Sequence, residues 1–177
     1  MDHNDHVNLL RPANLGQGSY ADFGAGSGAF TLALRELVGL DSTIYAVDKD
    51  RSALNELDSA HHTRFNSTRN LLLLPSDFSR SLDLPPLDGI VMANSLHFFK
   101  DKEKILRHVR GFLKPNGALL IVEYNVDSGN MWVPYPLTFE TYAKLTLRVG
   151  FSEPRLLAKT PSRFLKEFYS AVAYRSE

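Results

Sequence analysis

The sequence contains a glycine-rich turn followed by a carboxylate, and together they indicate a ligand-binding site. Gly24, Gly26 and Gly28 alternate with small side chains between a short apolar run and an amphipathic segment. Such a turn lets the backbone lie close against a ligand, and the amides that open the next helix point at it. Asp48 ends the next apolar run, 48 − 28 = 20 residues beyond the last glycine. A carboxylate at this spacing meets ribose hydroxyls in a βαβ unit, so the pattern indicates a nucleotide-cofactor site.

The glycines alone do not identify the cofactor. Read as Gly24-x-Gly26-x-x-Ala29, the turn also satisfies the dinucleotide fingerprint, which keeps an NAD-dependent oxidoreductase as an alternative. No Tyr-x-x-x-Lys pair or other hydride-transfer constellation follows in the sequence, which disfavours that alternative.

The segments around the turn predict a mostly parallel sheet. Five short apolar runs, each separated from the next by a crossover, read as strands: 19–23, 43–47, 71–74, 89–93 and 118–122. Helical spacing of apolar residues predicts helices over 30–38, from Asp50 toward His61 and His62, from Asp101 to a reversing turn at 114–117, and from Thr138 to near Gly150. Residues 155–160 and 164–174, joined by a tight turn at 161–163, read as an antiparallel hairpin.

Composition narrows the class of protein. A chain of 177 residues, 44% of them hydrophobic, is most simply one domain over 1–177. Lys plus Arg and Asp plus Glu both number 20, so no basic field favours nucleic acid or a membrane surface. The absence of cysteine excludes disulfides, a cysteine nucleophile and a thiolate metal site. With no signal peptide or membrane-spanning run, we expect a soluble, cytoplasmic protein; its oligomeric state is left open.

Four separated segments of the chain resemble the class I S-adenosylmethionine-dependent methyltransferases. They are the acidic residue and alternating glycines of 22–28, Val47 to Asp50, Pro75 to Phe78, and Leu113 to Leu120. The resemblance runs from about Tyr20 to Tyr174. It implies an α/β fold, a doubly wound Rossmann-like seven-stranded sheet with helices on both faces and an antiparallel last strand. It also implies S-adenosyl-L-methionine as the cofactor and a methyl acceptor, which we expect to be a small molecule.

The resemblance assigns cofactor contacts along the chain. The glycine turn implies a polar backbone for the methionine part, and Asp22 an anchor for its ammonium group. Asp48 is expected to accept from the ribose hydroxyls, and Asp77 and Phe78 to bind the adenine. The whole expected cofactor set is Asp22, Gly24, Ala25, Gly26, Gly28, Asp48, Lys49, Asp77, Phe78 and Asn94.

Residues 94–99 follow the fourth strand, where methyl donor and acceptor should meet. His97 is the best-placed general base there, although a structural histidine is an equal alternative. Tyr124, Trp132 and Tyr135 are expected to shape the acceptor pocket or, equally, to pack the loop. Relatives that use magnesium carry an Asp at the end of the fourth strand and an Asp-Asn pair after the fifth, a pattern that this chain lacks. No metal is therefore expected.

Two segments outside the predicted sheet are expected to recognise the methyl acceptor. Residues 1–17 are expected to form a lid or cap, and residues 125–137 an acceptor-side loop. Because no strong catalytic signature stands at 94–97, a non-catalytic protein that binds an S-adenosyl ligand remains a second alternative.

Overall fold

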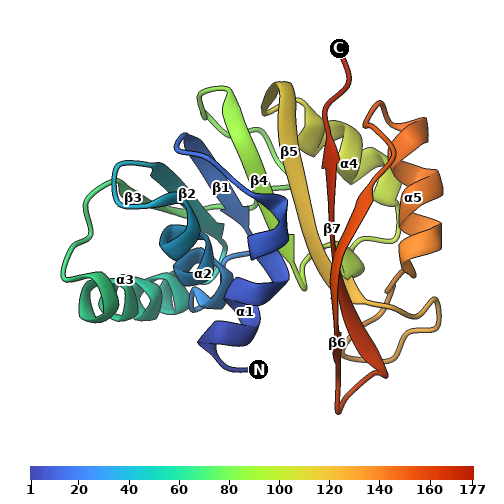
Figure 1. Ribbon diagram of the computed structural model, residues 1–177, viewed down its shortest axis with the longest axis horizontal. Coiled ribbons are helices and arrows are strands. Elements are labelled where there is room, and N and C mark those ends of the chain that lie inside the picture. Colours follow the sequence, from blue (N-terminus) through green and yellow to red (C-terminus); the bar gives the residue numbers. More distant parts are fainter.

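The computed structural model describes residues 1–177, and a single seven-stranded sheet runs through it (Figure 1). The strand order is β3-β2-β1-β4-β5-β7-β6. The strands are β1 (Ser19–Phe23), β2 (Thr43–Asp48), β3 (Leu71–Pro75), β4 (Leu87–Ala93), β5 (Leu113–Tyr124), β6 (Arg155–Pro161) and β7 (Glu167–Tyr174). The pairs among β1 to β5 are parallel, while β7 is antiparallel to both β5 and β6. This is the predicted doubly wound, Rossmann-like sheet.

Helices cover both faces of the sheet (Figure 1). They are α1 (His3–Leu10), α2 (Ala29–Val38), α3 (Arg51–Phe65), α4 (Lys102–Arg110) and α5 (Phe139–Arg148), with short 3-10 turns η1 (Arg11–Ala13) and η2 (Leu96–Phe98). The longest helix, α3, has 15 residues, and none combines the length and apolarity needed to cross a membrane.

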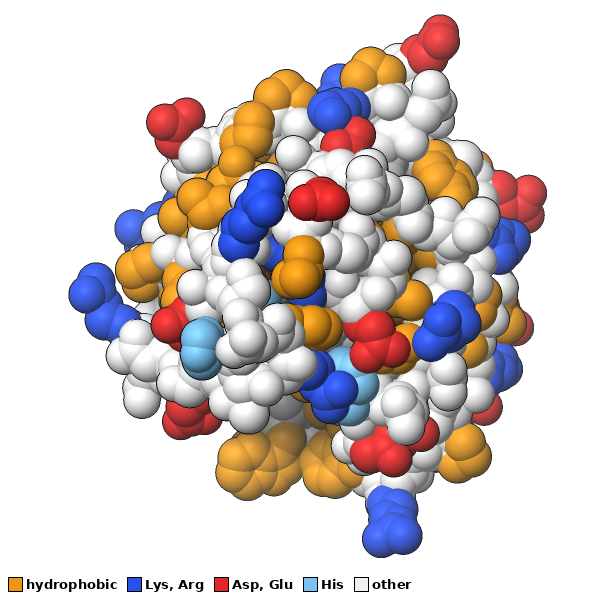
Figure 2. All heavy atoms as spheres, turned by 60° about the vertical axis from the view of Figure 1, so that its left-hand side comes forward, with side chains coloured by type: hydrophobic (Ala, Val, Ile, Leu, Met, Phe, Trp, Pro, Cys, Tyr) orange, Lys and Arg blue, Asp and Glu red, His pale blue; other side chains and the backbone are white.

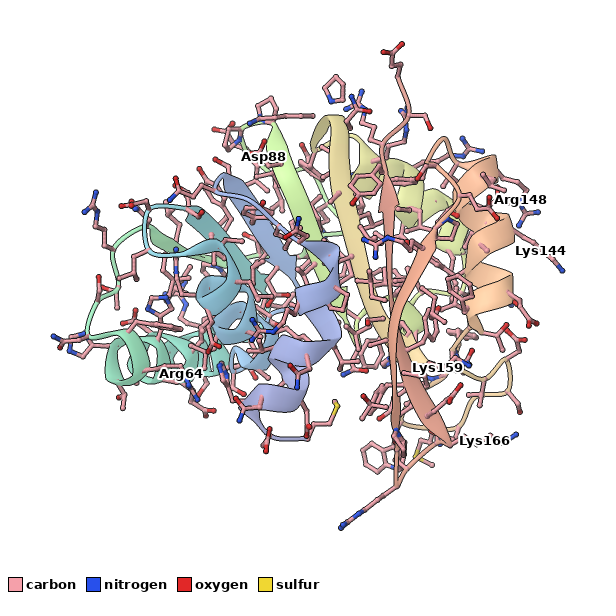
Figure 3. All side chains as sticks on the ribbon, in the orientation of Figure 1. Arg64, Asp88, Lys144, Arg148, Lys159 and Lys166 are labelled. Carbon is pink, nitrogen blue, oxygen red and sulfur yellow. The ribbon has the colours of Figure 1, made fainter.

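Strand β5 shows how the sheet separates two apolar cores. Leu119 and Ile121 pack into the core beneath α4 and α5, whereas Leu120 and Val122 pack into the core beneath α1 and α2. Successive side chains of a strand point to opposite faces, so this continuous apolar run buries both. Of the charged side chains labelled in Figure 3, in contrast, Asp88 is half-buried and the others are exposed.

The strand order reverses between β1 and β4, which are neighbours although β2 and β3 lie between them in sequence. Open α/β sheets bind ligands at such a switch point, outside the carboxyl ends of the strands. The fold therefore brings the glycine turn after β1 beside the segment after β4.

Two predicted boundaries are wrong. Residues 114–117 do not reverse the chain as a free turn, because β5 already begins at Leu113 and the segment bulges within the strand. The pairing jumps from Leu87↔Leu113 to Gly89↔Ala118, and Asn116 takes a φ of 62°. In the final hairpin β7 begins at Glu167, so the connection is longer than the expected 161–163 turn.

A buried polar network lies near the end of α3. The ring of His61 is buried and accepts a hydrogen bond from Arg35 Nε at 3.1 Å. The Arg35 guanidinium, itself 1% exposed, donates to the carbonyls of Gly39, Ser42 and Asn70. A buried charge needs such acceptors, and this network fixes α2 against α3.

Candidate functional site

The glycine turn is tied to the end of β2 by backbone hydrogen bonds. The amides of Gly24 and Ala25 donate to the Val47 carbonyl at 2.9 and 3.2 Å. Gly24, Gly26 and Gly28 have φ of 85°, 52° and 94°, in the left-handed region that favours glycine. A Cβ on Gly28 would lie 2.1 Å from Leu57 Cδ1, so a larger residue there collides with α3.

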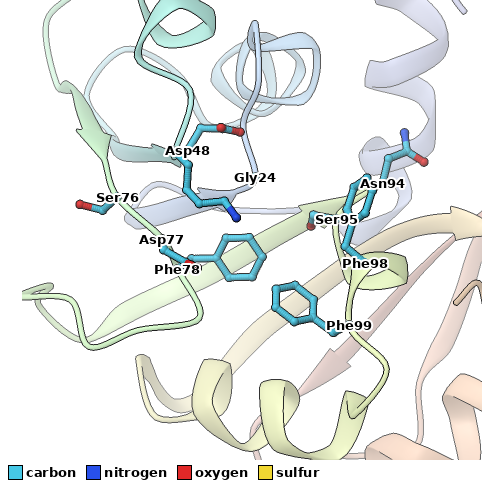
Figure 4. Close-up of a pocket in the computed structure, with 10 residues that line it drawn as sticks. Gly24, Asp48, Ser76, Asp77, Phe78, Asn94, Ser95, Phe98 and Phe99 are labelled. Atoms are coloured by element: carbon cyan, nitrogen blue, oxygen red, sulfur yellow. The ribbon is translucent and has the colours of Figure 1, made fainter. Parts of the chain in front are cut away.

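Two adjoining cavities open along this turn. The smaller, about 240 Å³, is lined by His6, Asp22, the segment 24–30, Ala93 and Asn94. The larger, about 320 Å³ and drawn in Figure 4, is lined by Gly24, Asp48, Lys49, Ser76, Asp77, Phe78, Asn94, Ser95, Phe98 and Phe99. Gly24 and Asn94 line both cavities. All ten residues expected to contact the cofactor thus lie along one cleft.

Asp22 is the carboxylate of the smaller cavity. It is 1% exposed and accepts a 2.6 Å hydrogen bond from Thr31 Oγ1. Burial raises the pKa of Asp22 to about 7, the charge of Asp48 adds to this, and the Thr31 hydrogen bond opposes it. An opposite charge entering the cavity would favour the ionised form of Asp22.

Asp48 links the turn to the larger cavity. Its Oδ2 accepts from the Gly26 amide at 2.8 Å, and its Oδ1 from the Asp50 amide at 2.9 Å. Each carboxylate oxygen has two acceptor positions, so both retain capacity for a ligand. Asp48 therefore shapes the glycine turn and can still bind hydroxyl groups.

The wall opposite Asp48 is aromatic (Figure 4). The Phe78 ring stacks on Phe23 at 5.3 Å and meets Phe99 edge-on at 5.4 Å. Beside it, Asp77 accepts from the amide and hydroxyl of Ser79, and the hydroxyl hydrogen bond holds the pKa of Asp77 below its ordinary value. An apolar face next to an ionised carboxylate suits a heteroaromatic ring with a polar edge.

Two buried oxygen atoms at the end of β4 have no hydrogen-bond partner. They are Asn94 Oδ1 and Ser95 Oγ, and Asn94 also has a left-handed φ of 52°. Buried polar atoms are normally paired, so unpaired ones in a cleft indicate a position for a ligand. The sequence did not single out Ser95, Phe98 or Phe99, whose only signal was that they follow the fourth strand.

His97 pairs with Glu123, a residue that sequence reasoning missed as a functional group. His97 Nδ1 lies 2.7 Å from Glu123 Oε2, and the His97 amide donates to Oε1 at 3.1 Å. The two side chains are 3% and 0% exposed. Because both carboxylate oxygens act as acceptors, we assign the ring proton to Nδ1, which leaves Nε2 as a free acceptor.

The three aromatic residues expected at the acceptor pocket lie in different environments. The Tyr124 ring is 6.2 Å from that of His97, and the Tyr135 amide donates to the His97 carbonyl at 3.0 Å. Trp132 is 72% exposed. None of the three lines either cavity, so their role in acceptor binding stays a prediction.

The comparison with known families identifies the class of protein to which the chain belongs. A model of the methyltransferase domain matches residues 21–119, more than half of the chain, and this range contains the whole expected cofactor set. The chain belongs to this methyltransferase family. With its strand order, it is a class I S-adenosylmethionine-dependent methyltransferase.

Individual relatives match this methyltransferase in sequence or in fold. Mouse acetylserotonin O-methyltransferase is 32% identical in an alignment of 153 residues that covers 76% of this chain and 39% of the relative. The chain thus spans about two fifths of the length of the curated relatives it matches. Magnesium protoporphyrin IX methyltransferase from Synechocystis, solved with bound SAM, has a TM-score of 0.75 at 16% identity, covering 98% of this chain and 78% of that one.

Human N-acetylserotonin methyltransferase, solved in complex with SAM, superposes with a TM-score of 0.72 at 20% identity. The match covers 98% of this chain and 52% of that one. At these identities the solved structures establish the fold of this methyltransferase, and its own residues must supply the argument about chemistry.

In this methyltransferase no three His, Asp or Glu side chains lie close enough together to hold a metal ion. Positive and negative side chains are interspersed over the face drawn in Figure 2.

Proposed function

We propose that the protein transfers the methyl group of S-adenosylmethionine to a hydroxyl group of a small molecule, with His97 as the general base. The observation that carries this proposal is the buried His97–Glu123 pair at the carboxyl ends of β4 and β5. Ser95, two residues before His97, and Phe98, directly after it, line the larger cavity, so the pair lies beside the cleft.

The residues of the cleft fit the cofactor in two parts. In the smaller cavity, Asp22 and the glycine turn suit the ammonium and carboxylate groups of methionine. In the larger cavity Asp48 suits the ribose, and Asp77 with Phe78 suits the adenine. The unpaired Asn94 and Ser95 oxygens lie near the junction of the two cavities, where a sulfonium charge would find acceptors.

When bound, S-adenosylmethionine supplies an electrophilic methyl group on a sulfonium. The protein must hold the acceptor in line with that methyl group and keep water out. A hydroxyl acceptor arrives protonated and is a weak nucleophile, so a base that takes its proton accelerates the transfer. His97 Nε2 is the free acceptor for that proton.

Glu123 is the positioning residue for His97. Its hydrogen bond to Nδ1 fixes the ring tautomer, and its charge stabilises the imidazolium that forms when Nε2 takes a proton. Because Glu123 also accepts from the His97 amide, it fixes the backbone as well as the ring.

The mouse relative, whose name describes an O-methyltransferase of acetylserotonin, supports a small acceptor with an aromatic part. Tyr124, Tyr135 and Trp132, on and beside the acceptor-side loop 125–137, are the groups that we propose to contact it. Phe98, 60% exposed at the edge of the larger cavity, belongs with them.

We propose that residues 1–177 form one methyltransferase domain and that it acts in the cytoplasm.

The test uses wild type, His97→Ala and Glu123→Gln in a methyl-transfer screen against hydroxylated aromatic compounds, with S-adenosylhomocysteine binding measured in parallel. We expect both variants to bind this product normally but to lose about 10²–10⁴-fold in turnover. Exposed His62→Ala is the matched control. An acidic phenol, already ionised at neutral pH, should restore most of the turnover of His97→Ala.

Three results would contradict the proposal. Full turnover of an unionised phenol by His97→Ala would remove the base. Binding of NAD without binding of S-adenosyl ligands would favour the oxidoreductase alternative. Cofactor binding without turnover of any acceptor would favour the non-catalytic alternative.

A further inference from the structure

The N-terminal helix α1 is fixed beside the smaller cavity. Asp2 caps it through a capping box with Asp5, and Val7, Leu9 and Leu10 are buried in the core that α2 shares. His3 Nε2 lies 2.7 Å from Glu36 Oε2, which joins α1 to α2. A helix with a satisfied cap and a buried apolar face holds its remaining side chains in defined places.

One of those side chains, His6, lines the smaller cavity together with Asp22 and the glycine turn. Its ring rests edge-on against Phe30, with 4.8 Å between ring centroids, and is half-buried. Burial lowers the pKa of His6, as do the N-terminus and His3, while Asp5 and Asp2 act in the opposite direction. A neutral imidazole in this place offers one N–H donor to the cavity.

The start of α2 forms another part of the cavity wall. Its N-cap is Gly28, which has no side chain to accept from the first-turn amides. Uncapped amides and the positive end of a helix dipole favour an anionic group. Asp22, the one carboxylate that lines this cavity, repels an anion and attracts a cation. The cavity therefore suits a zwitterion with its two charges apart.

We infer that His6 is a cofactor-binding residue that donates a hydrogen bond to the α-carboxylate of the methionine part, which the α2 amides also hold. The inference rests on the proposed function of the cleft. It reassigns part of residues 1–17, which the sequence placed on the acceptor side, to the cofactor. Helix α1 then completes the methionine site, while Asp22 binds the ammonium group.

Two ligands separate this role from a structural one. S-adenosylhomocysteine carries the methionine-derived amino and carboxylate groups, whereas 5′-methylthioadenosine keeps the adenosine and the sulfur but lacks them. By calorimetry, we expect His6→Ala to lose about tenfold or more in affinity for S-adenosylhomocysteine and nothing for 5′-methylthioadenosine. His6→Gln, which keeps an N–H donor, should recover part of that loss.

His3→Ala is the matched control, because His3 lies on the same helix and contacts α2 without lining the cavity. An unchanged affinity of His6→Ala for S-adenosylhomocysteine would overturn the inference and leave the proposed function intact. Equal losses for both ligands, or an equal loss in His3→Ala, would show that α1 acts only through the fold and would also overturn it. Failure of wild type to bind either ligand would overturn the proposed function itself.

Discussion

Replacing Asp48 by Asn tests the cofactor site at a residue whose carboxylate also accepts hydrogen bonds from two backbone amides. The Asp48 carboxylate accepts from the amides of Gly26 and Asp50, one on each oxygen. An Asn side chain keeps one oxygen and turns an NH₂ group toward the other amide, so one of these hydrogen bonds is lost. The same change removes an acceptor and the negative charge from the ribose position.

The size of the effect follows from these contacts. A hydrogen bond to a charged group contributes about 1.5–3 kcal/mol. Asp48 is half-buried at the mouth of the larger cavity, which favours the lower part of that range for each of the two ribose contacts. Because Asn keeps one oxygen, we expect one ribose contact to be lost and the other to be weakened, which gives a total of about 1.5–3 kcal/mol. This total corresponds to roughly a 10- to 100-fold loss of affinity for S-adenosylhomocysteine.

Calorimetric titration of wild type, Asp48→Asn and Asp50→Asn makes the measurement specific. Asp50 lies two residues away and carries the same charge, but it caps α3 and does not line the cleft. Asn caps a helix about as well as Asp, so Asp50→Asn loses one nearby charge at little structural cost. We expect its affinity to stay within about threefold of wild type. Equal affinities of Asp48→Asn and Asp50→Asn would refute the ribose contact.

Two further predictions concern pH. The pKa of Asp22, about 7 in the folded state against 3.8 for the free group, means that the stability from its protonated form is lost as pH rises between these values. Asp22→Asn should therefore melt higher than wild type at pH 8, with a difference that shrinks toward pH 4, and should bind S-adenosylhomocysteine more weakly. A lower melting temperature at pH 8 would contradict this. Burial, with the charge of Arg35, lowers the pKa of His61 below 6.5, so the stability it contributes above that pH is lost as pH falls through its folded pKa. Toward pH 5, His61→Asn should lose less stability in thermal melts than wild type or the exposed control His62→Asn; equal losses in all three would show that His61 does not carry the effect.

The strands and most helix starts could be predicted from sequence because their signals are local. Continuous apolar runs mark strands buried on both faces, and this reading holds for β1 to β4 within two residues at each end. Asp50, Asp101 and Thr138 each cap the helix that follows through a side-chain oxygen. A cap needs only its own first turn, so the sequence contains the whole interaction.

The start of β5 could not be predicted because distant partners decide it. Pro115, Asn116 and Gly117 have the composition of a turn, and Asn116 does take a left-handed φ. Yet the Asn116 amide donates to the Arg175 carbonyl near the end of the chain, and Leu113 already pairs with Leu87. Tertiary pairing extends the strand through residues that would locally favour a turn.

The roles of His97 and Glu123 likewise depend on a contact between residues that are distant in sequence. The position of His97 after the fourth strand was readable, but position alone left a base and a structural histidine equally supported. Glu123 ends an apolar run in which a charged residue has a high cost unless it is paired. The free-energy cost of burying this charge predicts that Glu123 has a partner, but it does not identify His97 as that partner. The two side chains come together only when β4 and β5 pair in register, with Ala93 opposite Val122. The buried 2.7 Å contact favours the base, because it gives the ring both a fixed tautomer and a nearby negative charge.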